Sequence, residues 1–245
     1  MDRSNLESFT RFALVGGIPK YWEFVGAGAS ALDLAEELFF GRSAFLEDEP
    51  MRILRGERIA GLAPLSLLEA VGRGASKPSE IAARLGTAQT NLGRTLQQLL
   101  DASLLEREIP FGESLRSTKK TLYRIADPAL RFWFGVYSPQ RTLWHRLDVP
   151  EKAKLLHDHA ATVFEDHCRA KHPGASRYWE TGAEFDFVRR EDAGLVVAEA
   201  KFKILSAGER EALARETAAK WRSTSLGRKN PEAAIEILDA SMLAG

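Results

Sequence analysis

The segment that decides the expected fold is Tyr178-Trp-Glu-Thr-Gly-Ala-Glu-Phe-Asp-Phe-Val-Arg-Arg-Glu-Asp-Ala-Gly-Leu-Val-Val-Ala-Glu-Ala-Lys-Phe-Lys203. Two short apolar runs flank a charged turn, a pattern typical of a β-hairpin. Side chains alternate along a strand, so Glu199 and Lys201 share one face. The hairpin can bring Asp186 beside them. Two carboxylates and a lysine are the groups needed to hold Mg²⁺ and to activate a water molecule.

This arrangement resembles the PD-(D/E)xK nuclease superfamily, with Asp186 as the first acid and Glu199-Ala200-Lys201 as the Glu-x-Lys motif. The superfamily often adds an acid from its first helix, and Glu165 matches it. The resemblance implies that Asp186 and Glu199 hold Mg²⁺ with the Ala200 carbonyl, that Glu165 assists through water, and that Lys201 orients or deprotonates the attacking water. The expected elements around the motif are helices at 160–171 and 207–222 and a last strand at 233–238.

An ordinary ion pair is the alternative interpretation of the Glu-x-Lys motif, because cross-strand pairs of opposite charge are common in sheets. A divalent metal between Asp186 and Glu199 would favour a nuclease. A Lys201–Glu199 ion pair that fills a closed pocket would favour a non-catalytic protein.

The whole chain of 245 residues has room for one to three domains. It contains no apolar run of about 20 residues, the length needed to cross a membrane. The N-terminus lacks the features of a signal peptide. Cys168 is the only cysteine, so no disulfide can form within the chain. These observations predict a cytoplasmic protein without a membrane partner.

The middle of the chain is basic, with 12 Lys and Arg against 7 Asp and Glu in residues 51–125. Its pattern predicts a winged helix-turn-helix over 59–125, with Ser76 or Ser79 as a helix cap and Gly86 as a helix end. The predicted elements are helices at 59–71, 76–86 and from Thr87 onward, a wing turn at 111–120 and a strand at 121–125.

A winged helix suits DNA binding, because its recognition helix can enter the major groove. Gln89 and Asn91 are candidates for adenine edges and Arg94 for guanine or phosphate. At the wing, basic side chains are placed to meet phosphates; these are Arg116, Lys119 and Lys120. Winged helices also serve as protein-interaction modules, which remains the alternative.

Two further motifs complete a resemblance over nearly the whole chain: Val15-Gly-Gly-Ile-Pro-Lys-Tyr21 and Leu122-Tyr-Arg-Ile-Ala-Asp-Pro-Ala-Leu-Arg-Phe-Trp-Phe134. Together with the hairpin motif they resemble the archaeal-type ATPases of prokaryotes. That family carries an AAA-like P-loop domain, then a winged helix and a DUF234 domain with a nuclease-like core. No P-loop motif occurs in this sequence, so we expect no ATP site in it. Where the family has its lid, an apolar patch is expected to recruit a separate ATPase subunit or a second copy; its members are Phe12, Leu14, Tyr21 and Trp22.

The resulting prediction is a mixed α/β protein with a restriction-endonuclease-like α/β/α domain at its C-terminal end. The predicted divisions are a helical lid-like segment at 1–55, a winged helix at 56–126, a helical connector at 127–149 and the nuclease-like domain at 150–245. The predicted function is DNA binding with Mg²⁺-dependent phosphodiester hydrolysis. The alternatives are a non-catalytic regulator that binds DNA or protein, and a fragment of an ATPase whose ATP-binding domain is missing.

Overall fold

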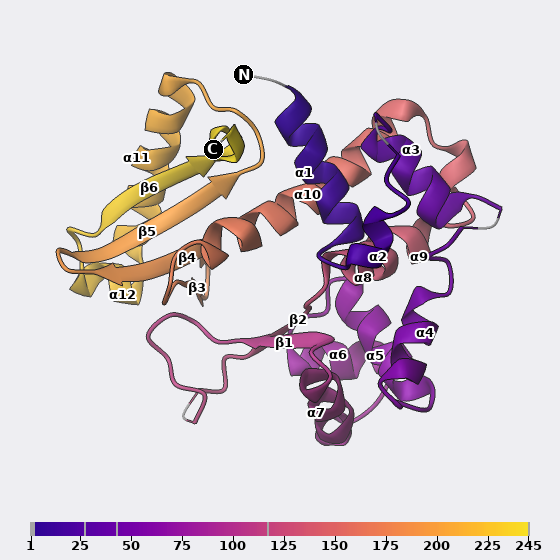
Figure 1. Cartoon of the computed structure of the whole chain (residues 1–245). Coiled ribbons are helices and arrows are strands. Elements are labelled where there is room, and N and C mark those ends of the chain that lie inside the picture. Colours follow the sequence, from indigo (N-terminus) through magenta and orange to yellow (C-terminus); the bar gives the residue numbers. More distant parts are fainter. Residues whose placement is uncertain (1–2, 27, 43, 117, 245) are drawn as a thin grey trace. The chain divides into compact units, whose positions relative to one another are not determined.

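The computed structural model describes residues 3–26, 28–42, 44–116 and 118–244. It combines helices with β-strands, which confirms the predicted mixed α/β class (Figure 1). The chain forms two compact units. We call them the helical unit, which comprises Glu7–Arg107 and Thr121–Ala160, and the sheet unit, which comprises Met1–Leu6, Glu108–Lys120 and Ala161–Gly245.

Short helices and an aromatic core characterise the first part of the helical unit. Ser30 begins one of these helices, since its hydroxyl accepts the Asp33 N–H while the Asp33 carboxylate accepts the Ser30 N–H. Phe40 stacks on the fully buried Trp144 with ring centroids 3.9 Å apart. The helices are α1 (Arg3–Val15), α2 (Pro19–Trp22), α3 (Ala31–Ala35), the π-helical η1 (Glu36–Phe40) and α4 (Glu49–Gly56).

The predicted apolar patch of the N-terminal segment is wrong, because this core covers most of it. Leu14 and Tyr21 are buried, and Phe12 is partly buried. The Tyr21 hydroxyl also donates a hydrogen bond to Glu49. Only Trp22 of the four is exposed, and its indole N–H donates to the Gly16 carbonyl at 3.0 Å. The segment therefore uses its apolar side chains for its own packing.

The middle of the chain forms three helices and a two-stranded sheet within residues 62–125. They are α5 (Leu62–Gly72), α6 (Pro78–Leu85), α7 (Gly93–Asp101) after the 3₁₀ turn η2 (Gln89–Leu92), β1 (Leu105–Glu108) and β2 (Leu122–Ile125). Gly86 ends α6 in the left-handed conformation at φ 62°, as predicted. The predicted serine cap is wrong. The Glu80 carboxylate instead accepts the N–H groups of Ser76 and Lys77, each at 3.2 Å.

Gly72 at the end of α5 allows a close approach of two helical segments. A Cβ atom at this position would lie 2.2 Å from Cβ of Phe134. Phe134 is fully buried in the same apolar core as Leu67, Leu96 and Leu99. The absence of a side chain at Gly72 is therefore what lets this core close.

A helical connector follows β2 and leads into the longest helix. Asp127 begins it by accepting the Leu130 N–H at 2.9 Å. Its elements are α8 (Pro128–Phe132), the π-helical η3 (Trp133–Tyr137), α9 (Ser138–Gln140), the 3₁₀ turn η4 (Trp144–Arg146) and α10 (Val149–Ala170). The helix predicted at 160–171 is thus the second half of α10.

The sheet unit contains a four-stranded sheet in the order β3-β4-β5-β6. The strands are β3 (Ser176–Glu180), β4 (Ala183–Glu191), β5 (Gly194–Lys201) and β6 (Ala234–Asp239). The first three are antiparallel, and β6 is parallel to β5. A parallel neighbour requires a long crossover, which here contains α11 (Ala207–Ser223) and α12 (Ser225–Lys229); the 3₁₀ turn η5 (Ala240–Ala244) follows β6.

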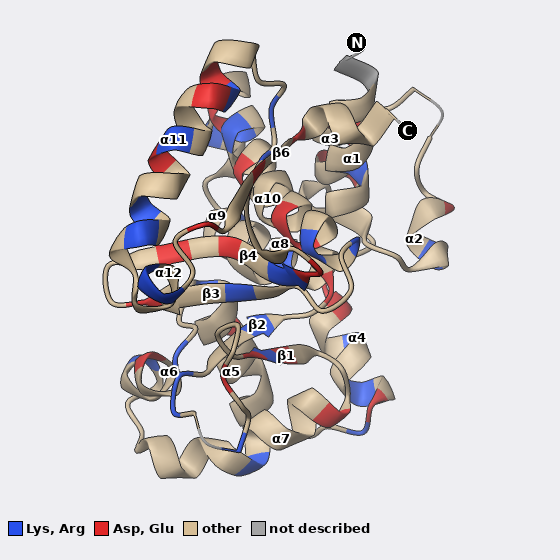
Figure 2. Ribbon diagram, turned by 90° about the vertical axis from the view of Figure 1, so that its left-hand side faces the viewer, with Lys and Arg blue, Asp and Glu red and all other residues tan. Residues whose placement is uncertain are grey.

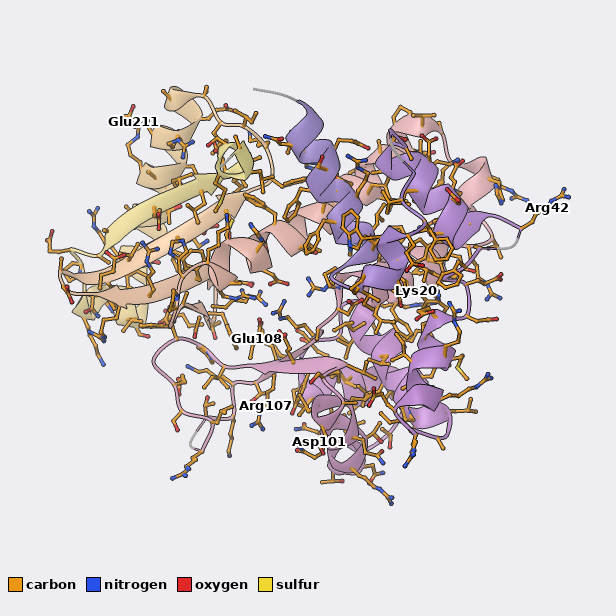
Figure 3. All side chains as sticks on the ribbon, in the orientation of Figure 1. Lys20, Arg42, Asp101, Arg107, Glu108 and Glu211 are labelled. Atoms are coloured by element: carbon orange, nitrogen blue, oxygen red, sulfur yellow. The ribbon has the colours of Figure 1, made fainter. Side chains whose placement is uncertain are left out.

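One side of α11 packs against the sheet. Its Trp221 is buried in an apolar core with Tyr178, Phe185 and Val188. The outer side is charged, with acidic and basic residues close together along the helix (Figure 2). Glu211 extends outward there (Figure 3) and pairs with Arg215 at 2.6 Å. The predicted helix at 207–222 and strand at 233–238 are confirmed to within one residue.

None of the helices formed by the described residues combines the length and the apolar character needed to cross a membrane.

Candidate active site

The candidate site lies where β4 and β5 separate. Their paired residues run from Glu191 opposite Gly194 to Phe187 opposite Ala198. Asp186 comes one residue beyond the last pair, and its Oδ2 accepts the Ala200 N–H at 2.7 Å. A side chain thus takes the place of a strand partner and holds the Asp186 carboxyl next to the Glu-x-Lys motif.

Glu199 is a buried carboxylate on the inner strand β5, with 7% of its surface exposed. Two ammonium groups contact it. Lys201 Nζ lies 3.5 Å from its Oε2, and Lys220 Nζ on α11 lies 2.9 Å from its Oε1. Both lysines are partly exposed, so the positive charges lie between the buried acid and the solvent.

The pKa values of two acids in this part of the sheet unit are raised. Burial raises the pKa of Asp186 to about 6, and the neighbouring Glu199 carboxylate adds to the rise through its charge and a hydrogen bond. Burial also raises the pKa of Glu165 on α10 to about 8, with a further contribution from Asp186 and an opposing one from Lys201. The four residues predicted for catalysis therefore lie near enough for their charges to interact: Asp186 and Lys201 affect the pKa of Glu165, and Glu199 and Lys201 affect that of Asp186.

The chemistry of these donors fits a hard divalent cation, because carboxylate oxygens are the ligands that Mg²⁺ prefers. The Glu199 carboxylate lies close enough to raise the proton affinity of Asp186, and a cation would relieve that repulsion. Within the described parts of the chain, however, no three His, Cys, Asp or Glu side chains are grouped so that they could hold a metal ion. The side-chain ligands that the geometry offers are thus the pair Asp186 and Glu199.

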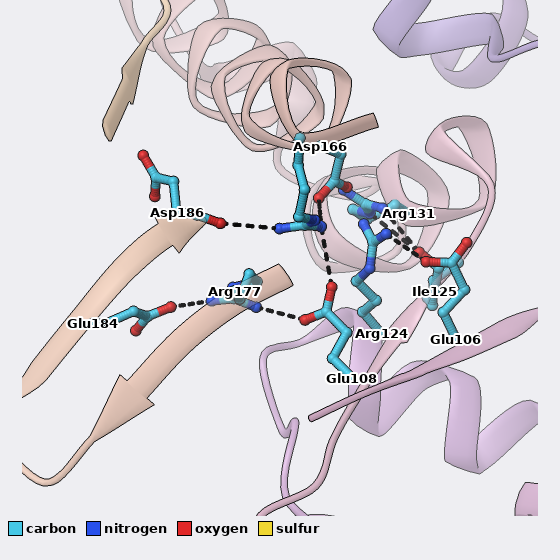
Figure 4. Close-up of polar contacts among 10 residues, drawn as sticks. Glu106, Glu108, Arg124, Ile125, Arg131, Asp166, Arg177, Glu184 and Asp186 are labelled. Carbon is cyan, nitrogen blue, oxygen red and sulfur yellow. Dashed lines mark hydrogen bonds and ion pairs between the residues drawn. The ribbon is translucent and has the colours of Figure 1, made fainter. Parts of the chain in front are cut away.

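An arginine network, which the sequence did not predict, supports the Asp186 backbone. Arg169 on α10 donates to the Asp186 carbonyl at 3.3 Å and to carboxylate oxygens of Glu108 and Asp166. Figure 4 shows Asp186 with its main-chain oxygen facing this network and its carboxylate turned the other way. Arg169 follows Glu165 by four residues, which places both on one face of a helix. That spacing in the sequence could have indicated that Arg169 lies near the site.

A second arginine links the loop after β1 to β3. Arg177 contacts Glu108 at 2.9 Å and also pairs with Glu184 (Figure 4). The Arg177 carbonyl accepts the Phe111 N–H at 2.7 Å, and Phe111 packs against the apolar core of the sheet unit. The beginning of the predicted wing turn is therefore bound to β3.

The predicted DNA contacts fall in two places. Gln89, Asn91 and Arg94 are exposed on η2 and the start of α7 in the helical unit. The remaining three lie in the segment Glu108–Lys120 of the sheet unit, where they too are exposed; they are Arg116, Lys119 and Lys120. Lys120 pairs with Glu113 at 3.2 Å within this segment.

In comparisons with known proteins, no family model, no curated protein and no solved structure matches this chain.

Proposed function

We propose that the sheet unit is a PD-(D/E)xK-type nuclease domain that hydrolyses phosphodiester bonds of DNA with a divalent cation. The observation that carries this proposal is the convergence of Asp186 and Glu199 at the point where β4 and β5 separate, with Lys201 beside them. The order of elements agrees with it: α10 is followed by β3, β4 and β5, and the helices α11 and α12 then lead to β6.

Each residue of the site has a role in this proposal. Asp186 and Glu199 would hold a cation such as Mg²⁺, and Glu165 would assist from α10. The cation would supply positive charge that favours ionisation of an attacking water and offsets charge on the phosphate. Lys201 would orient that water or, as the neutral amine, accept its proton, and the resulting ammonium would stabilise negative charge that develops in the transition state.

We further propose that residues 56–126 are a winged helix that binds DNA. Three helices followed by a two-stranded sheet support this, as does the exposure of Gln89, Asn91 and Arg94 on η2 and at the start of α7. These side chains would read base edges, while the basic residues of the wing segment would meet phosphates. The relation to archaeal-type ATPases with a DUF234 domain is part of the same proposal and carries no ATP site into this chain.

A non-catalytic regulator is the second candidate function, and one observation favours it. Lys201 forms an ion pair with Glu199 at 3.5 Å, which is the ordinary structural use of a Glu-x-Lys motif. In this alternative the site stabilises the sheet unit, and the protein binds DNA or another protein without cleaving it.

Cleavage of single- and double-stranded DNA with Mg²⁺ or Mn²⁺ separates the two candidates. The purified chain is compared with Lys201→Ala and with Lys229→Ala, a control at an exposed lysine on α12. We expect cleavage that falls at least about 100-fold in Lys201→Ala, because charge stabilisation at a reacting group is commonly worth that much, and that persists in the control. DNA binding without cleavage by the unaltered chain would establish the regulator instead.

A further inference from the structure

Lys220 is the part of the site that the hairpin motif does not contain. It lies on the last turn of α11, 21 residues from Glu199 in sequence. Its Nζ is 2.9 Å from Glu199 Oε1, a shorter contact than the 3.5 Å between Lys201 and Oε2 of the same carboxylate. The hydrogen bond therefore joins the crossover helix directly to the proposed ligand.

A second contact fixes the position of this ammonium group. Lys220 Nζ lies 4.4 Å from the centre of the Phe185 ring, within the range of a cation–π interaction. Phe185 is fully buried and precedes Asp186 on β4. The lysine is thus held between an aromatic ring of one strand and a carboxylate of the next, so its charge has a defined place beside the acids.

We propose that Lys220 is a built-in counter-ion of Glu199 that competes with the divalent cation for this carboxylate and so sets the affinity of the site. The inference rests on the proposed function, because it assumes that Glu199 binds a cation. Without one, Lys220 neutralises a buried carboxylate whose exposure is 7%. When a cation binds, Glu199 Oε1 has to be shared or released by the ammonium.

Electrostatics gives the direction of the effect. Two positive charges that share one carboxylate repel each other, and this repulsion is strong at the short distances within such a partly buried site. Removal of the ammonium should therefore strengthen cation binding. A lysine that merely held Glu199 in a productive orientation would have the opposite effect on removal.

Binding of Mn²⁺ to the full chain, measured by titration calorimetry, tests this without any need for activity. The variants are Lys220→Met, Lys220→Arg, which keeps the charge, and the exposed Lys229→Met as the matched control. We expect Lys220→Met to bind Mn²⁺ at least about 10-fold more tightly, and Lys220→Arg to stay within about twofold of the unaltered chain. Equal or weaker binding by Lys220→Met would overturn the proposal.

A thermal double-mutant cycle gives a second readout in EDTA. Lys220→Met should lower Tm by about 3 °C, and it should have little effect in a chain that already carries Glu199→Gln. Equal losses in both backgrounds would show that Lys220 does not act through Glu199.

The Mn²⁺ titration tests the cation site and the counter-ion role of Lys220 separately. If neither the unaltered chain nor Lys220→Met binds Mn²⁺, the cation site itself is refuted and the counter-ion role falls with it. If both bind Mn²⁺ equally, the cation site stands and only the role of Lys220 is refuted.

Discussion

His159 of the helical unit and the acids Glu165 and Asp186 of the sheet unit are buried in different surroundings. In the helical unit, His159 is buried with its Nε2 2.8 Å from the Ala13 carbonyl oxygen and its ring against Phe132. Burial lowers the pKa of His159 to about 4, so the ring is neutral at pH 7. In the sheet unit, burial raises the pKa of Glu165 and of Asp186, and a nearby carboxylate adds to each rise: Asp186 for Glu165, and Glu199 for Asp186.

This difference indicates which buried ionisable groups mark a functional site. A single neutral group with a backbone partner needs nothing further to be stable. Acids that converge and oppose each other's ionisation cost folding free energy, and such arrangements cluster at functional sites. The proposed nuclease site therefore rests on convergence, which the helical unit lacks at His159.

The largest expected effect on stability concerns Glu165→Gln, measured in EDTA. The pKa of Glu165 is raised by folding, so its contribution to stability is complete below pH 4.5 and is lost as the pH rises toward 8. Glutamine cannot ionise. We expect the variant to be more stable than the unaltered chain at pH 8 by on the order of 2–4 kcal/mol, and nearly equal at pH 4.

Urea unfolding at a series of pH values measures this difference. Glu211→Gln on the exposed side of α11 is the matched control and should change stability by less than about 0.5 kcal/mol. If Glu165→Gln and the unaltered chain show the same pH dependence, the acids are not coupled as the structure places them.

His159→Gln should change the pH dependence in the opposite sense. Because folding lowers the pKa of this ring from 6.5 to about 4, the unfolded chain takes up a proton that the folded chain does not. The unaltered protein therefore loses about 3 kcal/mol as the pH falls from 6.5 to 4. Glutamine should remove this loss, although the lost ring packing lowers stability at every pH.

The slope of stability against pH is thus the quantity to compare. His145→Gln, at an exposed histidine of η4, is the control. If the stability of His159→Gln falls with decreasing pH as steeply as that of the unaltered chain, the loss of stability in acid arises from other residues.

The smallest expected effects come from two glycines of the helical unit. Gly72→Ala would place Cβ 2.2 Å from Cβ of Phe134 and should cost about 1–3 kcal/mol through overpacking. Gly93→Ala at the start of α7 meets nothing within 4 Å and has helical φ of −52°. It should stabilise by about 0.5–1 kcal/mol, because alanine lowers the entropy of the unfolded chain. Chemical unfolding at pH 7 measures both, and equal effects would contradict the close approach at Gly72.

Local patterns predicted most elements of the sheet unit. Two apolar runs around a charged turn predicted β4 and β5, and the i, i+2 spacing placed Glu199 and Lys201 on one face. The interruption of pairing at Asp186 was not predictable, because it depends on where two strands diverge. The serine cap of α6 and the exposed N-terminal patch were wrong, since Glu80 caps two N–H groups and an aromatic core covers Leu14 and Tyr21.

The sequence by itself determined the class of structure, the hairpin and the identity of the acids Asp186 and Glu199, because periodicity and spacing along a strand are local properties. Only the tertiary structure decided which groups surround them. Lys220 reaches Glu199 through the crossover between β5 and β6, and Arg169 reaches the Asp186 carbonyl from α10. Contacts between residues far apart in sequence depend on how helices pack against a sheet, and no local pattern specifies them.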